Sequence, residues 1–113
     1  MSDINVQVVE TTLSRAKKIV KMKDSLEILA KNPHFKRVII EGYFEDKAIA
    51  LVSALASPNR EHPDCQKAIQ KQIEGIGALQ QHFNIIKAEG SLAEKAVHEN
   101  EIYLERLLEE DGE

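Results

Sequence analysis

The sequence predicts an all-α protein, because helix-start signals divide it into segments whose apolar residues recur at intervals of three and four. The four signals are Asn32-Pro33, Ser57-Pro58-Asn59, His62-Pro63-Asp64 and Ser91-Leu92-Ala93-Glu94. We expect a long antiparallel helical hairpin of residues 33–56 and 64–89, with an additional N-terminal basic helix and C-terminal acidic helix.

The composition is that of one folded domain covering residues 1–113. Hydrophobic residues make up 42% of the chain and charged residues 30%, which is ordinary for a soluble globular protein. Aromatic residues make up only 4%, so Ile, Leu, Val and Ala fill most apolar positions, as they do where helices pack along a seam. Long packed helices fit this composition best.

The distribution of charge is uneven along the chain. Residues 1–60 carry ten Lys and Arg against seven Asp and Glu, whereas residues 61–113 carry five against twelve. A chain with a basic first half and an acidic second half can pair head to tail with itself or with a neighbour.

Features of secreted and membrane proteins are missing from the sequence. Cys65 is the single cysteine, so an intramolecular disulfide is impossible and a reducing cytosol is expected. Residues 1–10 do not resemble a secretion signal, and the apolar runs are far shorter than the roughly 20 residues that span a bilayer. We expect no membrane partner.

The first part of the chain is predicted to form an arm and a helix. Residues 1–12 show no clear periodicity and are expected to be a flexible arm, in which Val6, Val8 and Val9 could form a docking strand. From Leu13 the apolar residues follow helical spacing, which predicts a helix over residues 13–31.

The second helix is predicted to begin after a sharp junction. Asn32 suits the N-cap position, and Pro33 suits the first helical position, where its missing N–H costs nothing. The apolar pattern continues to about Ala56. Gly42 lies inside this helix, and we expect it to mark a close contact with another helix.

A loop and two further helices complete the predicted chain. The prolines and turn formers of residues 57–63 predict a loop, and a third helix follows, in which Gly75 and Gly77 allow close approach of a partner. Glu89-Gly90 suits a helix end and Ser91-x-x-Glu94 suits a capping box, so a fourth helix should begin there. Residues 109–113 form an acidic tail.

One apolar stripe of the hairpin, with two aromatic residues opposite it, is a candidate binding surface for a protein partner. Such a stripe can equally be an internal seam between the two helices of the hairpin. Long helices in a short chain leave much apolar flank exposed, so a homo-oligomer or docking on a larger assembly would complete the fold. The candidate residues are Tyr43, Phe44, Ile76, Leu79, Phe83 and Ile86.

The basic stretch in the first helix is a candidate phosphate-binding site. Its cations could lie along nucleic-acid phosphates, but no aromatic residue is interleaved for base stacking. The alternatives are a solvated helix face and a surface complementary to the acidic last helix. Nucleic acid is therefore a possible but not a favoured partner. The candidate residues are Arg15, Lys17, Lys18 and Lys21.

Motifs of enzymes and metal sites are incomplete in this sequence. Glu41 and Glu45 share a helix face, but the Glu-x-x-His repeats of a di-iron bundle do not occur. His62 and Cys65 are half of a zinc site without the other half, and we interpret Cys65 as a lone buried or half-buried thiol. We expect no catalytic residue, no metal and no cofactor.

The junction and the hairpin carry a packing pattern composed of Asn32-Pro33-His34-Phe35-Lys36, Glu41-Gly42-Tyr43-Phe44, Ala48, Leu51-Val52, Ser57-Pro58, Ile73-Glu74-Gly75-Ile76-Gly77-Ala78-Leu79 and Phe83. Over about residues 26–108 this pattern resembles small helical proteins encoded by tailed bacteriophages. The resemblance implies a phage origin and a virion or assembly role, with no catalytic residues to carry over.

The expected function follows from the predicted fold and the resemblance together. We expect a non-enzymatic phage structural or assembly protein that binds other copies, or a head component such as portal or capsid, through its apolar stripes. Its expected location is the virion or the host cytoplasm. The alternative is a small regulatory protein that binds a host enzyme or nucleic acid through its charged helices.

Overall fold

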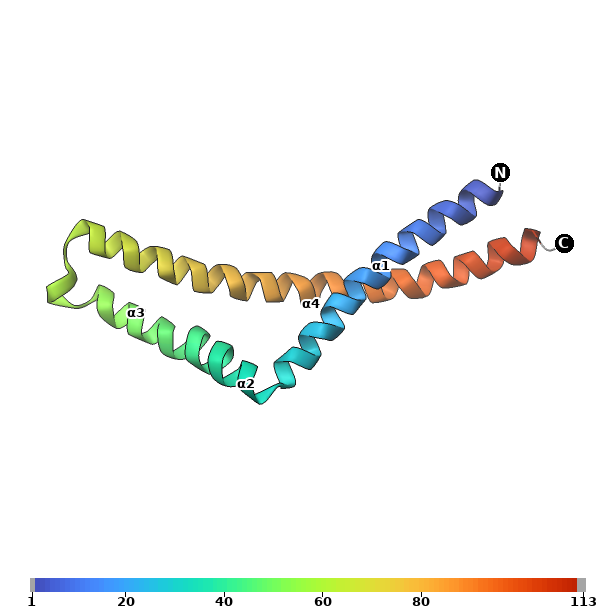
Figure 1. The fold of residues 1–113 in the computed structure, drawn as a ribbon. Helices are drawn as coiled ribbons and strands as arrows, with labels where there is room; N and C mark the ends of the chain where they lie inside the picture. Colours follow the sequence, from blue (N-terminus) through green and yellow to red (C-terminus); the bar gives the residue numbers. More distant parts are fainter. Residues whose placement is uncertain (1, 112–113) are drawn as a thin grey trace. The chain divides into compact units, whose positions relative to one another are not determined.

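The computed structural model describes residues 2–111, with side chains for residues 4–110, and it is all-helical over that range, as predicted. Segments α2, η1 and α3 follow one another without a break, so the described chain has three main helices, of which α4 is the longest (Figure 1). The elements are α1 (Ser2–Lys31), α2 (Pro33–Phe35), the π-helix η1 (Lys36–Lys47), α3 (Ala48–Leu55), the 3₁₀ turn η2 (Pro58–Arg60) and α4 (Pro63–Asp111).

The chain divides into two compact units, which are described separately. Of the described residues, unit 1 contains 2–26 and 85–111, and unit 2 contains 27–84. Unit 1 therefore pairs most of α1 with the last part of α4, and unit 2 contains the segments between them. The single domain over residues 1–113 stays a prediction.

Helix α1 begins much earlier than the sequence pattern predicts. Residues 2–12 are helical, and the suggested docking strand is wrong. Val9 is buried and Val6 is half-buried on the face that meets α4, so packing outweighs the weak preference of β-branched residues for strands. Met1 and residues 112–113, at the ends of the predicted arm and acidic tail, lie outside the described residues. The flexibility of the arm stays a prediction.

The junction between α1 and α2 forms as predicted. The Asn32 side chain accepts hydrogen bonds from the backbone N–H groups of His34 at 2.8 Å and Phe35 at 3.2 Å, and Pro33 occupies the first helical position. This cap satisfies donors that the first helical turn would otherwise leave unpaired.

The helix predicted over residues 33–56 is not a uniform α-helix, because Lys36–Lys47 form a π-helix. Four of its inward residues recur every four or five positions, as the wider turn requires: Phe35, Ile39, Phe44 and Ala48. Gly42 lies in the middle of this segment. A Cβ atom there would be 3.0 Å from the Arg37 carbonyl oxygen in the same helix, so Gly42 accommodates the π-helix and is not the contact between helices that we expected.

A short turn connects α3 to α4 within unit 2. The Gln66 side chain donates hydrogen bonds back across this turn to the backbone carbonyls of Leu55 and Arg60. The Asp64 N–H donates to His62 Nδ1 at 3.1 Å. The side chain that directly precedes α4 thus supplies an acceptor for an N–H group of its first turn. The loop predicted over residues 57–63 is therefore present, with η2 inside it.

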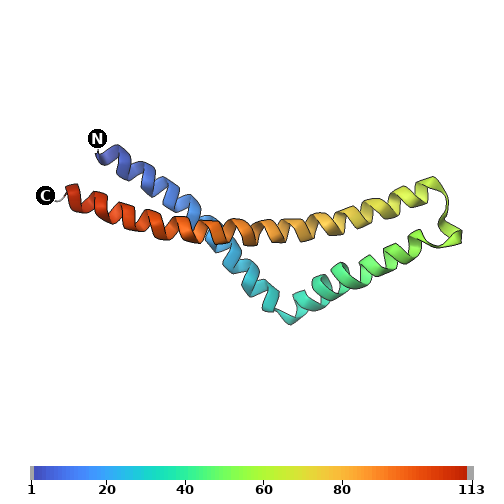
Figure 2. The same ribbon diagram turned by 180° about the vertical axis from the view of Figure 1, so that it is seen from behind.

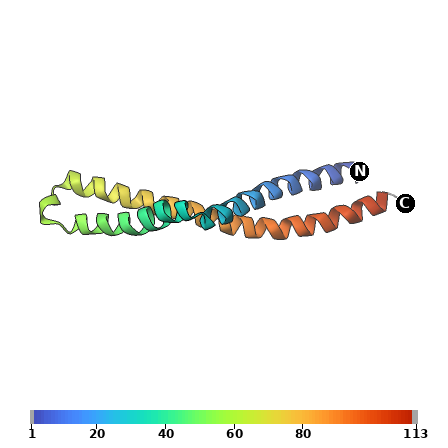
Figure 3. The same cartoon turned by 60° about the horizontal axis from the view of Figure 1, so that its bottom comes forward.

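The core of unit 2 lies between the η1–α3 segment and the first part of α4, which run side by side (Figure 3). Leu51, Ile69 and Ile76 are its buried residues, and Ile76 is only 4% exposed. The Phe83 ring lies 6.0 Å from the Phe35 ring and 5.9 Å from the Phe44 ring between centroids. These distances suit favourable tilted and edge-to-face aromatic pairs.

The helix boundary predicted at Glu89-Gly90 does not exist. Helix α4 runs without interruption from Pro63 to Asp111, and the supposed capping box of residues 91–94 lies in its interior. Gly90 is buried against α1, so its small size serves helix packing and not helix termination. In Figures 1 and 2 the last part of α4 continues beside α1.

Within residues 2–111, no helix has a stretch that is both long and apolar enough to cross a bilayer.

Candidate interaction surfaces

Unit 1 is a pair of helices that run in opposite directions. Lys17 lies opposite Glu101 and Lys23 lies opposite Glu94, so residue numbers rise on one helix as they fall on the other. Both helices contribute buried or half-buried residues at alternating spacings of three and four, which is the pattern of a coiled-coil seam. The seam of unit 1 consists of Val6, Val9, Leu13, Ala16, Val20 and Lys23 on α1 and Ile86, Gly90, Ala93, Val97, Asn100, Leu104 and Leu107 on α4.

Small and polar residues occupy part of this seam. A Cβ atom on Gly90 would lie 2.4 Å from the Lys23 Cβ, so only glycine fits where the Lys23 stem crosses α4. The Lys23 side chain is 16% exposed, and its Nζ atom bonds the Glu94 carboxylate at 2.6 Å. The Lys23 methylenes thus fill the seam while the charge reaches an acid at its edge.

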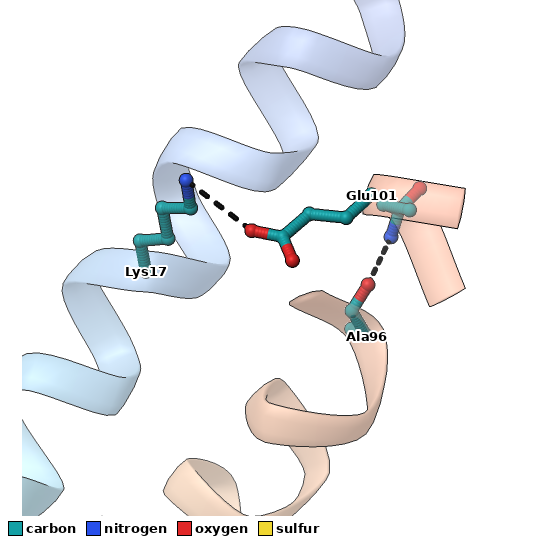
Figure 4. Close-up of polar contacts among 4 residues, drawn as sticks. Lys17, Ala96 and Glu101 are labelled. Atoms are coloured by element: carbon teal, nitrogen blue, oxygen red, sulfur yellow. Dashed lines mark hydrogen bonds and ion pairs between the residues drawn. The ribbon is translucent and has the colours of Figure 1, made fainter. Parts of the chain in front are cut away.

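The residue after each seam position faces one side of unit 1, which we call the polar side. Here Lys17 Nζ lies 3.5 Å from Glu101 Oε1. Figure 4 shows this ion pair as a dashed line between the two helices. Next to this pair the Asn100 side chain donates to the Ala96 carbonyl at 2.7 Å, so the polar seam residue is satisfied within its own helix. The polar side contains Gln7, Glu10, Ser14, Lys17, Lys21 and Asp24 on α1 and Lys87, Ser91, Glu94, His98, Glu101, Glu105 and Leu108 on α4.

The residue before each seam position faces the opposite side, which we call the apolar side. Both helices are right-handed and they run in opposite directions, so a step of one residue back from the seam leads to the same side of the pair on each helix. Large apolar residues are exposed there, and Leu92 is the most exposed at 67%. These residues are Val8, Ile19 and Met22 on α1 and Ile85, Leu92 and Tyr103 on α4.

The predicted partner-binding residues lie in or next to the core of unit 2, except Ile86, which lies in the seam of unit 1. Ile76 is buried in that core, and the Tyr43 and Phe44 side chains pack against it. The Tyr43 hydroxyl also lies 3.7 Å from where a Cβ would be on Gly75. Leu79, Phe83 and Ile86 are half-buried. This placement favours the interpretation as an internal seam, and binding of a partner by these residues stays a prediction.

The predicted phosphate-binding residues are exposed but lie on different sides of α1. Lys17 and Lys21 lie on the polar side, among the carboxylates of α4, whereas Arg15 precedes the seam residue Ala16 and lies on the apolar side. Lys18 is exposed on the surface of α1 away from the seam. A nucleic-acid backbone would meet these cations from several directions, so the geometry does not gather them into one patch.

The residues considered for metal or nucleophile chemistry remain scattered. Among the described residues, no three His, Cys, Asp or Glu side chains come close enough together to hold a metal ion. Cys65 is exposed near the start of α4, so the prediction of a buried or half-buried thiol is wrong. Cys65 lies one helical turn before Ile69, which is the first residue of α4 in the unit 2 core.

Sequence reasoning missed the apolar side of unit 1 and the fit of Lys23 over Gly90. One signal could have revealed the continuous helix on which both features depend. The three-and-four spacing runs unbroken from Ile76 to Leu107, straight through Gly90, which favours one long helix over two short ones. Gly77 was expected to allow a close approach, but nothing lies within 4 Å of its Cβ position.

Comparison with known proteins finds no match for this chain. The sequence matches no family model, no curated protein and no solved structure.

Proposed function

We propose that this chain is a non-enzymatic structural or assembly protein that acts by binding other protein chains through the apolar side of unit 1. One observation carries the proposal. Large apolar side chains are exposed on both helices of this side, whereas among the described residues Leu108 is the single large apolar residue on the polar side. An exposed apolar surface with a polar surface opposite is typical of an interaction site.

The shape of the proposed surface suits helices as partners. Its residues follow the spacing of three and four along two neighbouring helices, which forms ridges and grooves that another helical surface can fill. The antiparallel hairpin of residues 33–56 and 64–89 is proposed as a scaffold, because its aromatic residues already pack within unit 2.

We propose further that the assembly is that of a tailed phage, with the chain located in the virion or in the host cytoplasm during assembly. The support is the packing pattern around Asn32-Pro33 and Gly75, which resembles phage-encoded helical proteins. Its binding partners there would be other copies of the chain or a head component such as portal or capsid.

Particle composition tests this function. Gradient-purified particles of the source phage should contain the chain at a fixed copy number relative to the major capsid protein, measured by quantitative mass spectrometry. Leu92→Glu places a charge on the apolar side and should reduce incorporation, whereas the matched Leu108→Glu on the polar side should not. Absence of the wild-type chain from particles and from assembly intermediates would contradict the proposal.

A second function would use the charged surface of α1. Arg15, Lys17, Lys18 and Lys21 are all exposed, so binding of a host enzyme or a nucleic acid through them is the alternative. Replacing the three lysines with Glu should abolish nucleic-acid binding in a fluorescence anisotropy assay if this alternative holds. The same variant should enter particles normally if the first proposal holds.

A further inference from the structure

We propose that the occupant of the apolar side of unit 1 is a second copy of this chain, with α1 of each copy packed against α4 of the other. This inference rests on the proposed function and names its partner. Two such helix pairs, stacked through their apolar sides, make a four-helix bundle in which each pair buries the exposed residues of the other.

The charges of unit 1 select this arrangement. Residues 2–26 contain five Lys and Arg against three Asp and Glu, whereas residues 85–111 contain three against eight. Stacking α1 on α1 and α4 on α4 would place like charges together, which is unfavourable. A two-fold axis along the bundle instead places the basic helix of one copy on the acidic helix of the other, and it makes both contacts equivalent.

A specific charge pair follows from the register of unit 1. Arg15 directly precedes the seam residue Ala16, and Glu99 directly precedes Asn100, so both lie on the apolar side. Lys23 packs over Gly90, and Arg15 lies eight residues before Lys23 while Glu99 lies nine after Gly90, so Arg15 and Glu99 lie at nearly the same level along the antiparallel pair. Rotation about a two-fold axis parallel to the helices leaves each residue at the same height along the bundle. The long Arg15 side chain of one copy therefore reaches Glu99 of the second copy at the edge of the interface.

The apolar contacts at this level are complementary in size. Ile19 and Met22 of one copy face the stretch of α4 that contains Leu92 and Tyr103 in the other, with Ala96 between them. Large side chains from one helix can thus enter the space above a small residue on the other, as helix packing requires. Burial of these residues supplies the driving force, and the charge pair sets the orientation.

A charge-swap experiment tests the arrangement with the full-length chain. Arg15→Glu and Glu99→Arg should each weaken self-association at least about tenfold, because each change places like charges at both copies of the contact. The double variant restores opposite charges and should associate within about threefold of wild type. Analytical ultracentrifugation over a range of concentrations measures the dissociation constants, and circular dichroism verifies the helix content.

Matched changes on the polar side serve as controls. Lys21→Glu and Glu105→Arg alter the same kinds of charge on the same two helices, at exposed positions that follow the seam residues Val20 and Leu104. They should leave self-association unchanged. If they weaken it as much as the two single changes on the apolar side, net charge and not the Arg15–Glu99 contact governs association, and the inference is overturned.

The outcomes separate this inference from the proposed function. A wild-type chain that is monomeric at every concentration but enters particles contradicts the second copy as partner and leaves the assembly role standing. Association that neither single change weakens overturns the arrangement of α1 on α4. A chain that neither associates nor enters particles contradicts both.

Discussion

The two units bury their apolar residues in different ways. Unit 2 fills the space between its helices with large side chains, where Phe83 contacts Phe35 and Phe44 around a core of Leu and Ile. Unit 1 uses smaller and polar residues in its seam, including Ala93 and Gly90. Large apolar residues such as Leu13 and Leu107 are buried in this seam as well, and further ones are exposed on the flank of the helix pair.

This difference indicates a division of roles. The aromatic residues of unit 2 are half-buried against one another, so they gain part of their burial within the unit. Small residues bring two helices close together but bury little apolar area. The exposed residues of unit 1 gain their burial only when another surface covers the apolar side.

The largest effect is expected from breaking the core of unit 2. Ile76→Ala removes the most buried side chain described and should lower the free energy of unfolding by about 2–5 kcal/mol through lost burial and the cavity that remains. Ile49→Ala is the matched control, because Ile49 is 67% exposed, and it should change stability by less than about 0.5 kcal/mol. Urea unfolding at one protein concentration measures both. Equal effects would show that Ile76 is not a core residue.

Two glycine substitutions in α4 test the close approach in unit 1. Alanine favours a helix interior by about 1 kcal/mol over glycine, so Gly77→Ala should stabilise the protein, since nothing lies near its Cβ position. Gly90→Ala gains the same preference but forces Lys23 away, which costs about 1–3 kcal/mol.

The difference between the two variants isolates this cost. Thermal unfolding followed by circular dichroism should show Gly90→Ala less stable than Gly77→Ala by about 1–3 kcal/mol. Equal stabilisation by both would contradict the contact between Lys23 and Gly90.

A smaller effect is expected at the start of α2, which lies in unit 2. Asn32→Ala removes the acceptor for two backbone N–H groups and should cost about 1 kcal/mol. Asn32→Asp keeps an acceptor and should be nearly neutral. Urea unfolding compares the two variants, and a similar loss for both would indicate that Asn32 acts through something other than the cap.

The smallest effect is expected on the polar side of unit 1. Lys17 and Glu101 are both exposed, so Lys17→Gln should cost less than about 1 kcal/mol, and the cost should fall further at high salt. Lys18→Gln is the control on the same helix. A loss of several kcal/mol in Lys17→Gln alone would show that the polar side, and not the apolar side, is the critical surface of unit 1.

Local signals in the sequence were sufficient to predict some elements of the fold. Asn32-Pro33 predicted the junction correctly, because the cap depends only on residues within one helical turn. The turn with Pro58 and Pro63 was predictable for the same reason.

Features that depend on distant residues were not predictable in this way. Gly90 resembles a helix end locally, but Lys23, far away in the sequence, packs over it and the helix continues. The apolar residues around Gly42 also fit three-and-four spacing, which predicts an α-helix and gives no sign of the π-helix. Tyr43 and Phe83 both contact Phe44 within unit 2, and binding of a partner by these residues stays a prediction.

The most direct test of the central claim is sedimentation equilibrium of the wild-type chain beside Leu92→Glu and Leu108→Glu. The two variants make the same change at exposed leucines of α4, 67% and 52% exposed, on opposite sides of unit 1. We predict that the wild type and Leu108→Glu sediment as dimers at a concentration where Leu92→Glu is monomeric. Equal masses for the two variants, or a wild type that stays monomeric at every concentration, would contradict self-association through the apolar side.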